Sequence, residues 1–448
     1  MSSSVTVERI SDLTARAYGR SESGLLVPNG LPGELLRVRS SSERRWRRLG
    51  QVVELLEASP QRADAECAQA WDCPGCCFRC VPIETEQAWK RELLLRPFRR
   101  KGLELDPLLA PMVLPSHVEG YRIRCTAQAF VEDGHLLWGM RGFPWAARPI
   151  DLSRCPAQNG ATRAGLHSLA AQLDGLEVFD LERGVDGLRW LNLHADESVS
   201  TPARAVLIFS SAEAARRARP QLEAVRGFSL GVGVTPASSH KVFRADPEWI
   251  HGDSYAAFRA PGLGDLELLA APQSWTPVAA ANVHLVLSTL LSCLEDWDGV
   301  ELLELGCGVG TLSLALAQRG ARVWGVDLER RSVDSASLNA RHLQLCEAQA
   351  RFFQGEALKS VRRLLAKGRR FDVVILHAMR GGYGAECLRL IRLLGAGRVF
   401  LIYPTAASLA RELAELGLDG VFAMRRLHAF NQLPRSSATM VCAELSVG

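Results

Sequence analysis

The segment Glu301–Asp327 constrains the fold more than any other part of the sequence. An apolar run over 302–305 predicts a buried parallel strand, and the turn that follows, GCGVG at 306–310, has missing Cβ atoms where a ligand can approach the backbone. Leucines and alanines at helical spacing occupy 311–318, and a second strand at 323–326 ends in an acid. This order of strand, glycine turn, helix, strand and acid is typical of one half of a doubly wound nucleotide site.

The spacing of the glycines bears on which cofactor binds. Dinucleotide folds use G-x-G-x-x-G to hold a pyrophosphate, whereas this turn reads G-x-G-x-G and follows Glu304 by two residues. A carboxylate there would repel a pyrophosphate but can hold an amino group. S-adenosylmethionine (SAM) has an amino acid end, a ribose and no phosphate, so it fits better. The competing interpretation is a tight turn without a ligand.

The pattern resembles motif I of class I methyltransferases. The resemblance implies that Gly306, Gly308 and Gly310 line SAM, that Asp327 binds the ribose hydroxyls, and that Glu356 meets the adenine.

Length and composition set broad limits on the rest. A chain of 448 residues holds two or three domains, and its net charge of +4 permits a nucleic-acid partner without demanding one. No apolar run approaches the ~20 residues of a membrane span, and the first residues lack the apolar core of a signal peptide. We therefore expect a cytoplasmic monomer, in which twelve cysteines serve metal binding or burial rather than disulfides.

The first 62 residues predict a small β-barrel of OB type, because short alternating runs are separated by turn signals such as Pro28-Asn29-Gly30. Six arginines and Trp46 lie against a single acid in 37–48, a composition suited to RNA backbone and base stacking. A solvated charged hairpin is the alternative. The run GLLVPNGLPGELLRVR resembles the TRAM domain, a small RNA-binding barrel found in tRNA and rRNA modifying enzymes.

A dense group of cysteines follows the barrel. Cys67, Cys73 and Cys76 have C-x5-C-x2-C spacing, and Cys77 and Cys80 lie close behind. Zinc prefers four ligands, often as two separated pairs, whereas an iron–sulfur cluster accepts a tight run and one distant cysteine. The spacing leaves both metals open, including zinc held through the last three cysteines of the group.

The cysteine run resembles the cluster loop C-x5-C-G-G-C of the bacterial 5-methyluridine RNA methyltransferases, whose fourth ligand comes from a later Cys-Pro dipeptide. Here that dipeptide is Cys155-Pro156. The resemblance implies a [4Fe–4S] cluster held by Cys67, Cys73, Cys76 and Cys155. Farther on, Trp89–Lys101 predicts a basic amphipathic helix, which we interpret as a phosphate-facing surface, with a solvated face as the alternative.

The resemblance to this family covers nearly the full chain but breaks at the reactive centre. The family adds a cysteine thiolate to carbon 6 of uracil so that carbon 5 can attack the methyl group. At the matching strand end this chain has Pro404 in the nucleophile's position. Three other family motifs are also altered: D-P-P-R is replaced at His377–Arg380, F-F-Q-x-N at 275–279, and the general-base glutamate at about Ser437.

Together these features predict an α/β protein with three parts: an OB-type barrel (1–62), an α+β middle domain with the cluster loop (63–270), and a class I methyltransferase domain (271–448). Two functions remain open. One is an RNA methyltransferase, on rRNA or tRNA, that modifies an already nucleophilic atom through proximity to SAM, with His377 as a candidate general base. The other is a non-catalytic RNA-binding protein that keeps SAM and the cluster.

Overall fold

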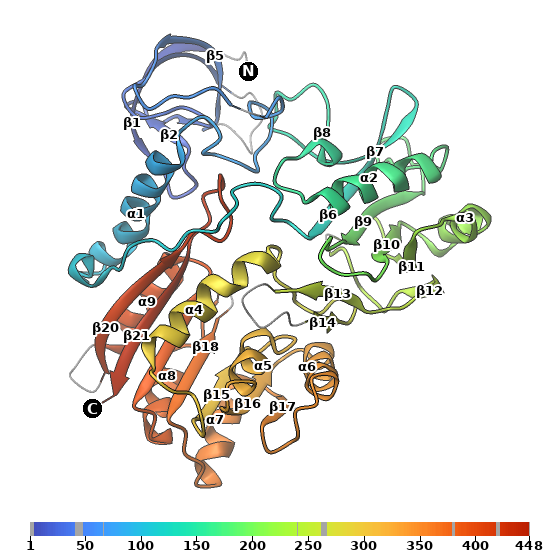
Figure 1. Cartoon of the computed structure of the whole chain (residues 1–448). Helices are drawn as coiled ribbons and strands as arrows, with labels where there is room; N and C mark the ends of the chain where they lie inside the picture. The colour runs from blue at the N-terminus through green and yellow to red at the C-terminus, as the bar shows by residue number, and fades with distance from the viewer. Residues whose placement is uncertain are drawn as a thin grey trace.

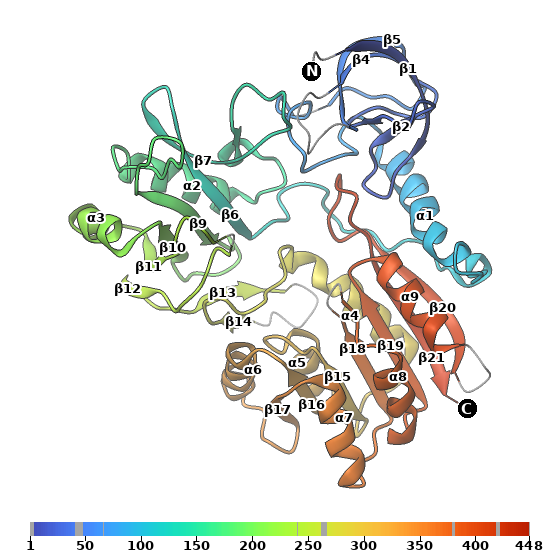
Figure 2. The same cartoon turned by 180° about the vertical axis from the view of Figure 1, so that it is seen from behind.

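The computed structural model describes residues 4–40, 48–65, 67–239, 241–260, 267–378, 381–417 and 422–447. Their strands form sheets of five, seven, two and seven strands, in chain order. Figures 1 and 2 show an N-terminal barrel, a middle sheet with its helices, and a C-terminal sheet with helices on both faces. In these residues no helix is long and apolar enough to cross a membrane.

The barrel is one antiparallel sheet in the order β3-β2-β1-β4-β5. Its strands are β1 Val5–Leu13, β2 Gly19–Ser21, β3 Leu26–Val27, β4 Leu35–Ser40 and β5 Gly50–Glu57. A bridge between Leu26 and Leu49 brings the two edges of the sheet together, around a small apolar core. Most of the arginine-rich segment, 41–47, lies outside the described residues; Arg37, Arg39 and Arg48 are described and exposed.

Helix α1, Ile83–Arg99, joins the barrel to the C-terminal domain. Its residues Leu94, Leu95 and Phe98 are buried in the same hydrophobic cluster as one face of the C-terminal sheet. On its other side, Arg96 donates to the Asp12 carboxylate of β1. The helix therefore contacts both the barrel and the C-terminal domain.

This packing corrects the expectation of a phosphate-facing helix at Lys90, and it pairs two other cations of the helix with carboxylates. Lys90 is buried, 2.8 Å from Glu86, and donates to the side-chain oxygen of Asn431 at 2.6 Å. Arg96 is held by Asp12, and Arg99 donates to Glu92 and to Asp106. A periodic cationic pattern predicted an exposed face, but these side chains pair with Glu86 and Glu92 of the helix itself and with Asp12, Asp106 and Asn431 from other segments.

The middle sheet has the order β12-β11-β10-β9-β6-β7-β8. Its strands are β6 Arg124–Glu132, β7 His135–Met140, β8 Ile150–Asp151, β9 Leu188–His194, β10 Ala203–Phe209, β11 Phe228–Val234 and β12 Glu248–His251. Helices α2 (Gly160–Gln172) and α3 (Ala212–Ala224) contribute leucines and alanines to its core. A hairpin, β13 Ala256–Arg259 and β14 Glu267–Ala270, leads out of this domain.

The C-terminal sheet has the order β17-β16-β15-β18-β19-β21-β20. Its strands are β15 Glu301–Leu305, β16 Arg322–Asp327, β17 Ala350–Gln354, β18 Val373–His377, β19 Arg398–Tyr403, β20 Phe422–Phe430 and β21 Met440–Val447. The first five are parallel, and β21 runs antiparallel to both of its neighbours. Alternating strands and helices explain the parallel part, because each crossover helix returns the chain to the same edge.

Two hydrophobic clusters cover the two faces of this sheet. One contains residues of α1, α7 (Ala357–Ala366), α8 (Ala385–Ile391) and α9 (Ala406–Leu416). The other contains residues of α4 (Val283–Cys293), α5 (Thr311–Ala317), α6 (Arg330–His342) and the β13–β14 hairpin. The strands are thus buried on both faces, as their continuous apolar runs predicted.

Candidate cofactor site and reactive centre

The candidate site lies at the carboxyl ends of β15 and β18. These two strands are adjacent and parallel, and the strand order reverses between them. Chains leaving neighbouring strands in opposite directions open a crevice at this point, where open α/β sheets bind their ligands. The glycine turn follows β15 and His377 ends β18, so the sequence motif and the topology indicate the same place.

Gly306 fits only as glycine. Its φ is +81°, and an added Cβ would overlap the carbonyl oxygen of His377 and lie 2.5 Å from the Tyr383 hydroxyl. That hydroxyl reaches the carbonyl oxygens of Leu305 at 2.8 Å and His377 at 3.0 Å. Tyr383 therefore fastens the ends of β15 and β18 together directly beneath the turn. This tyrosine carries no sequence signal, since its partners are backbone atoms.

Asp327 organises the turn from the end of β16. One carboxylate oxygen accepts the Gly308 backbone N–H at 2.9 Å, and the other accepts the Glu329 N–H at 2.9 Å. Each oxygen of an ionised carboxylate retains a further lone pair, so the side chain can also receive two hydroxyl donors. The ribose-binding role expected from the motif stays a prediction. The exposed side chain of Leu328 follows it at the rim.

Glu304, which is buried, and His377, which is partly buried, form a pair behind the turn. The Ser313 hydroxyl donates to one Glu304 oxygen at 2.5 Å, and the other oxygen is 4.0 Å from His377 Nδ1. Burial raises the pKa of Glu304 to about 7, partly offset by the Ser313 hydrogen bond. Burial lowers the pKa of His377 to about 4. At neutral pH the histidine is therefore uncharged, and the glutamate is close to its titration midpoint.

Glu356 lies at the same edge, one strand farther out. It precedes α7 and pairs with Lys359 at 2.8 Å, and half of its side chain is exposed. The adjacent Gly355 N–H donates to the Asp327 carbonyl oxygen at 2.9 Å, which sets the residue beside the end of β16. The structure thus brings together at one edge all six residues predicted to bind the cofactor: Glu304, Gly306, Gly308, Gly310, Asp327 and Glu356.

Trp275 covers the turn from the opposite side. Half of its surface is exposed, and its ring would lie 3.7 Å from a Cβ placed on Gly308. It contacts the edge of the His377 ring, with centroids 5.7 Å apart and an angle of 71°. An aromatic wall beside an open turn is suited to a planar ligand. The sequence placed this residue in an altered motif without predicting the contact.

Pro404 follows β19, the strand that pairs with β18, which ends at His377. The Ala378 N–H donates to the Ile402 carbonyl oxygen at 2.8 Å, so the residues that follow β18 and β19 lie side by side. Behind them, the buried Glu412 accepts the Tyr403 hydroxyl and the Gly384 N–H. This carboxyl holds the loop that follows β18. Met379 and Arg380, part of the altered D-P-P-R motif, lie outside the described residues.

Within the described part of this domain, the cysteines do not offer a thiol at that edge. Cys307, Cys387 and Cys442 are buried, and burial raises the pKa of each. Cys346 is exposed but precedes β17, and Cys293 precedes β15, so both lie toward the amino ends of the parallel strands. Ser437, at the expected general-base position, hydrogen-bonds the Cys77 thiol.

The four cysteines predicted to hold a cluster are brought together from two loops. The side chain of Gln69 donates to the Asp151 carbonyl oxygen at 2.9 Å and accepts the Asp151 N–H at 2.7 Å, which ties the loop of Cys67, Cys73 and Cys76 to the segment of Cys155. Burial raises the pKa of Cys73 to about 11, and the other three thiols, Cys76, Cys155 and Cys67, add to the increase. All four side chains are half-buried.

Arg79 places a positive charge at this group. Its guanidinium is almost fully buried and donates to Glu119. Burial works against its charge, but Cys76 and Glu119 raise the pKa of Arg79. The cysteine donor set together with a nearby cation suits an anionic metal–thiolate centre.

Cys77 and Cys80 have a different role. Both are buried in a hydrophobic cluster with Leu13, Leu31 and Phe78, between the barrel and α1. Burial raises the pKa of Cys77 to about 12. These thiols behave as small apolar side chains, and the structure separates them from the group of four that the spacing singled out.

Comparisons with known proteins agree with this geometry. A family model described as "Methyltransferase domain" matches residues 302–392. A 23S rRNA (uracil(1939)-C(5))-methyltransferase of Halomonas elongata is 30% identical over 84% of this chain and 76% of its own. An RNA methyltransferase of Halalkalibacterium halodurans is 24% identical over 96% of this chain and 93% of its own.

Among solved structures, a tRNA (uracil-54, C5)-methyltransferase of Pyrococcus abyssi, in complex with S-adenosyl-L-homocysteine, superposes with a TM-score of 0.77. It is 19% identical and covers 98% of this chain and 100% of its own. At 19% identity the match shows the fold alone. The shared fold includes the barrel, the middle sheet and the C-terminal sheet.

Proposed function

Since the chain belongs to the family of SAM-dependent uracil-C5 RNA methyltransferases, we propose that it binds SAM at the carboxyl ends of β15 and β16 and methylates an RNA base. The observation that carries this proposal is the Asp327 carboxylate at the end of β16, which accepts the Gly308 N–H of the glycine turn and retains further lone pairs. The target is an rRNA or tRNA, the two classes on which the named relatives act.

Each half of SAM has a complementary group in this chain. Asp327 would hold the ribose hydroxyls, Leu328 and Glu356 would contact the adenine, and Glu304 would face the amino group. A nearby ammonium favours the ionised carboxylate, so Glu304 would carry its negative charge beside the bound cofactor. Trp275, which lies over the glycine turn, would limit the directions from which the acceptor base approaches.

We propose that this protein transfers the methyl group without a covalent enzyme–RNA intermediate. Pro404 occupies the position of the family's nucleophile and has neither a thiol nor a backbone N–H. SAM supplies a methyl group bonded to a positively charged sulfur, which keeps the bonding electrons when the acceptor attacks. A ring nitrogen or hydroxyl is already nucleophilic and needs only correct placement and the loss of its proton.

His377 is the candidate acceptor of that proton. Its ring is uncharged at neutral pH because burial lowers the pKa to about 4, and it stands between Trp275 and Glu304. A base with so low a pKa holds a proton only briefly, and Glu304 lies 4.0 Å away to receive it. The pair therefore offers a short route away from the reacting atom.

The cysteines support a [4Fe–4S] cluster over a zinc site. Tetrahedral zinc with Zn–S bonds of about 2.3 Å requires sulfurs about 3.8 Å apart. Of the His, Cys, Asp and Glu side chains that the structure describes, one group of three brings its ligand atoms within 4.8 Å of one another, and it contains none of these cysteines. A cluster fills a wider space between Cys67, Cys73, Cys76 and Cys155.

Iron analysis tests the cluster. Protein purified without oxygen should be brown and contain about four irons per chain, and Cys155→Ser should lose most of them. Cys77→Ser serves as the matched control, because that buried thiol belongs to the apolar cluster and should leave the iron content unchanged. One zinc per chain and no iron would reverse the assignment.

For RNA binding we propose the arginine-rich end of the barrel, which resembles a TRAM domain. Arg37, Arg39 and Arg48 are exposed there. Charge reversal of Arg44, Arg45, Arg47 and Arg48 should abolish most of the salt-dependent affinity for RNA. Reversal of Arg183 and Arg216, exposed arginines of the middle domain, should not. Equal binding by both variants would show the segment to be a solvated hairpin.

The decisive experiment for activity is mass spectrometry of rRNA and tRNA nucleosides from cells with and without the gene. One methylated nucleoside should disappear and return on expression of the wild-type chain but not of Asp327→Ala. If nothing changes while the purified protein still binds SAM and RNA, the second function applies: a non-catalytic RNA-binding protein that keeps its cofactor. The replaced reactive centre is the observation that favours this alternative.

A further inference from the structure

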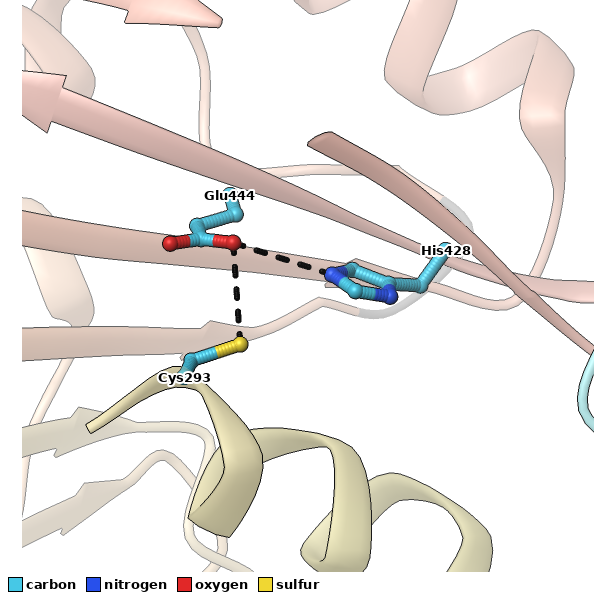
Figure 3. A group of neighbouring side chains, drawn as sticks. All are labelled: Cys293, His428 and Glu444. Atoms are coloured by element: carbon cyan, nitrogen blue, oxygen red, sulfur yellow. Dashed lines mark hydrogen bonds and ion pairs between the residues drawn. The ribbon is translucent and has the colours of Figure 1, made fainter. Parts of the chain in front are cut away.

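A second group of metal-ligating side chains lies away from the cofactor site. Cys293 is the last residue of α4, His428 lies in β20, and Glu444 lies in β21 (Figure 3). Their ligand atoms, Sγ, a ring nitrogen and a carboxylate oxygen, all lie within 4.8 Å of one another. The sequence separates these residues by up to 151 positions, so no spacing motif could reveal the group.

One oxygen of Glu444 is shared by the other two residues. Glu444 Oε2 is 3.6 Å from Cys293 Sγ and 3.8 Å from His428 Nε2, and Figure 3 shows it between them. The other oxygen, Oε1, accepts from Arg398, which also donates to the Cys293 carbonyl oxygen at 3.1 Å. A hydrogen bond of this kind orients a ligating carboxylate and leaves its second oxygen for an ion.

His428 supplies the independent sign of a ligand. Its side chain is 5% exposed, and its Nε2 is a buried atom without a hydrogen-bond partner. Stacking on Phe430 fixes the plane of the ring, so this nitrogen stays directed at Glu444 and Cys293. A buried polar atom without a hydrogen-bond partner destabilises the fold, and an ion at this position would remove that penalty.

We propose that Cys293, His428 and Glu444 bind one divalent zinc ion. Thiolate, imidazole and carboxylate are the three ligand types that zinc takes in proteins, and hard cations such as Mg²⁺ would not favour sulfur. Three protein ligands leave the fourth tetrahedral position for water. Cys293 is half-buried, so an ion can enter from that side.

The ion would fasten α4 to the antiparallel edge of the sheet. Without the ion, the Glu444 carboxylate is already paired with Arg398. The site is independent of methyl transfer, since it lies on the β20–β21 edge, whereas the candidate cofactor site is at the carboxyl ends of β15 and β16.

The test uses the full-length protein, freed of loosely held metal with a chelator and titrated with zinc against a chromophoric competitor. Wild type should bind one zinc that Cys293→Ser and Glu444→Gln bind at least tenfold more weakly. Cys346→Ser, which changes an exposed cysteine outside the group, should keep it. Equal zinc affinity in wild type and Cys293→Ser, or no zinc in wild type, would overturn the proposal.

Cobalt substitution provides a second readout that does not depend on stability. Co²⁺ in wild type and in Cys346→Ser should give a thiolate-to-metal absorption band that Cys293→Ser lacks. Zinc should also raise the thermal midpoint of wild type and not that of Cys293→Ser. Serine is nearly the size of cysteine, so this variant remains interpretable if Glu444→Gln, which weakens the pairing with Arg398, fails to fold. A band that survives in Cys293→Ser would assign the cobalt to other thiols.

Discussion

The two sides of the crevice differ in what they have kept. On the β15–β16 side, Gly306, Glu304 and Asp327 are all held by hydrogen bonds or close packing in a form suited to SAM. On the β18–β19 side the fold is equally tight, and our proposal puts Pro404 at the position of the family's nucleophile. Under that proposal, the backbone that positions a reactive group persists on both sides of the crevice, while the nucleophile itself is absent from the β18–β19 side.

The largest effect is expected from Gly306→Ala. The new Cβ would meet the His377 carbonyl oxygen, a backbone atom that cannot move aside, in a backbone conformation that disfavours side chains. Overpacking and left-handed strain together cost about 2–5 kcal/mol. SAM binding by calorimetry should be lost, and chemical denaturation should show the destabilisation.

Gly397→Ala is the matched control for that substitution. A Cβ there meets nothing within 4 Å and its φ is not positive, so both cofactor binding and stability should stay close to wild type. Normal SAM binding by Gly306→Ala would mean that the two strand ends are less tightly joined than the Tyr383 hydrogen bonds indicate.

The second prediction concerns the pH dependence of stability through Glu304. Folding raises its pKa from an ordinary 4.5 to about 7. The folded protein therefore holds a proton that the unfolded chain releases, and this contribution to stability is complete below pH 4.5 and is lost as pH rises through 7. Glu304→Gln removes the dependence and keeps an oxygen for Ser313. As pH rises from 4.5 to 8, the free energy of unfolding of Glu304→Gln should increase relative to that of wild type by up to about 3 kcal/mol.

Bound SAM should favour the ionised form of Glu304 over the protonated form. A bound ammonium favours the ionised carboxylate, so SAM affinity in wild type should increase from pH 6 to pH 8, and Glu304→Gln should show little such increase. If the SAM affinity of both proteins depends on pH in the same way, the amino group of SAM does not face Glu304 and must bind elsewhere in the crevice.

A smaller effect is expected from Asp327→Ala. Loss of charge-assisted hydrogen bonds to the ribose should weaken SAM binding by ~1–3 kcal/mol, and the freed Gly308 N–H should loosen the turn. Glu356→Ala tests the next strand end; its carboxylate is half-exposed and already paired with Lys359, so its loss should cost less than that of Asp327. If calorimetry detects no binding of SAM to the wild-type protein, both proposed functions are wrong.

The cofactor side could be predicted from sequence because its signals are local. The strand, turn and acid lie within Glu301–Asp327, and the structure assembles them as the pattern indicates. Trp275, Tyr383 and the Cys293 group could not be predicted, because each acts through residues distant in the chain. Helix α1 shows the opposite error: its cations predicted an exposed face, but tertiary partners such as Asp12 and Asn431 hold several of them.

The last prediction concerns Pro404 and is the smallest effect: no covalent complex with RNA is expected. Fluorine at carbon 5 of uridine blocks the final proton removal, so an enzyme with a catalytic cysteine stays bonded to carbon 6 after methyl transfer. That bond requires a thiolate within reach of the base. Wild-type protein incubated with SAM and 5-fluorouridine RNA should therefore give no complex that survives a denaturing gel.

Pro404→Cys should not restore the adduct. A thiol at the end of β19 would still lack the family's glutamine, at Pro277, and its general base, since Ser437 hydrogen-bonds the Cys77 thiol. An adduct formed by Pro404→Cys alone would show that the scaffold on the β18–β19 side remains competent and that one substitution separates the two mechanisms. An adduct formed by wild type would place a reactive cysteine, Cys387 or Cys442, at the base, which their burial opposes.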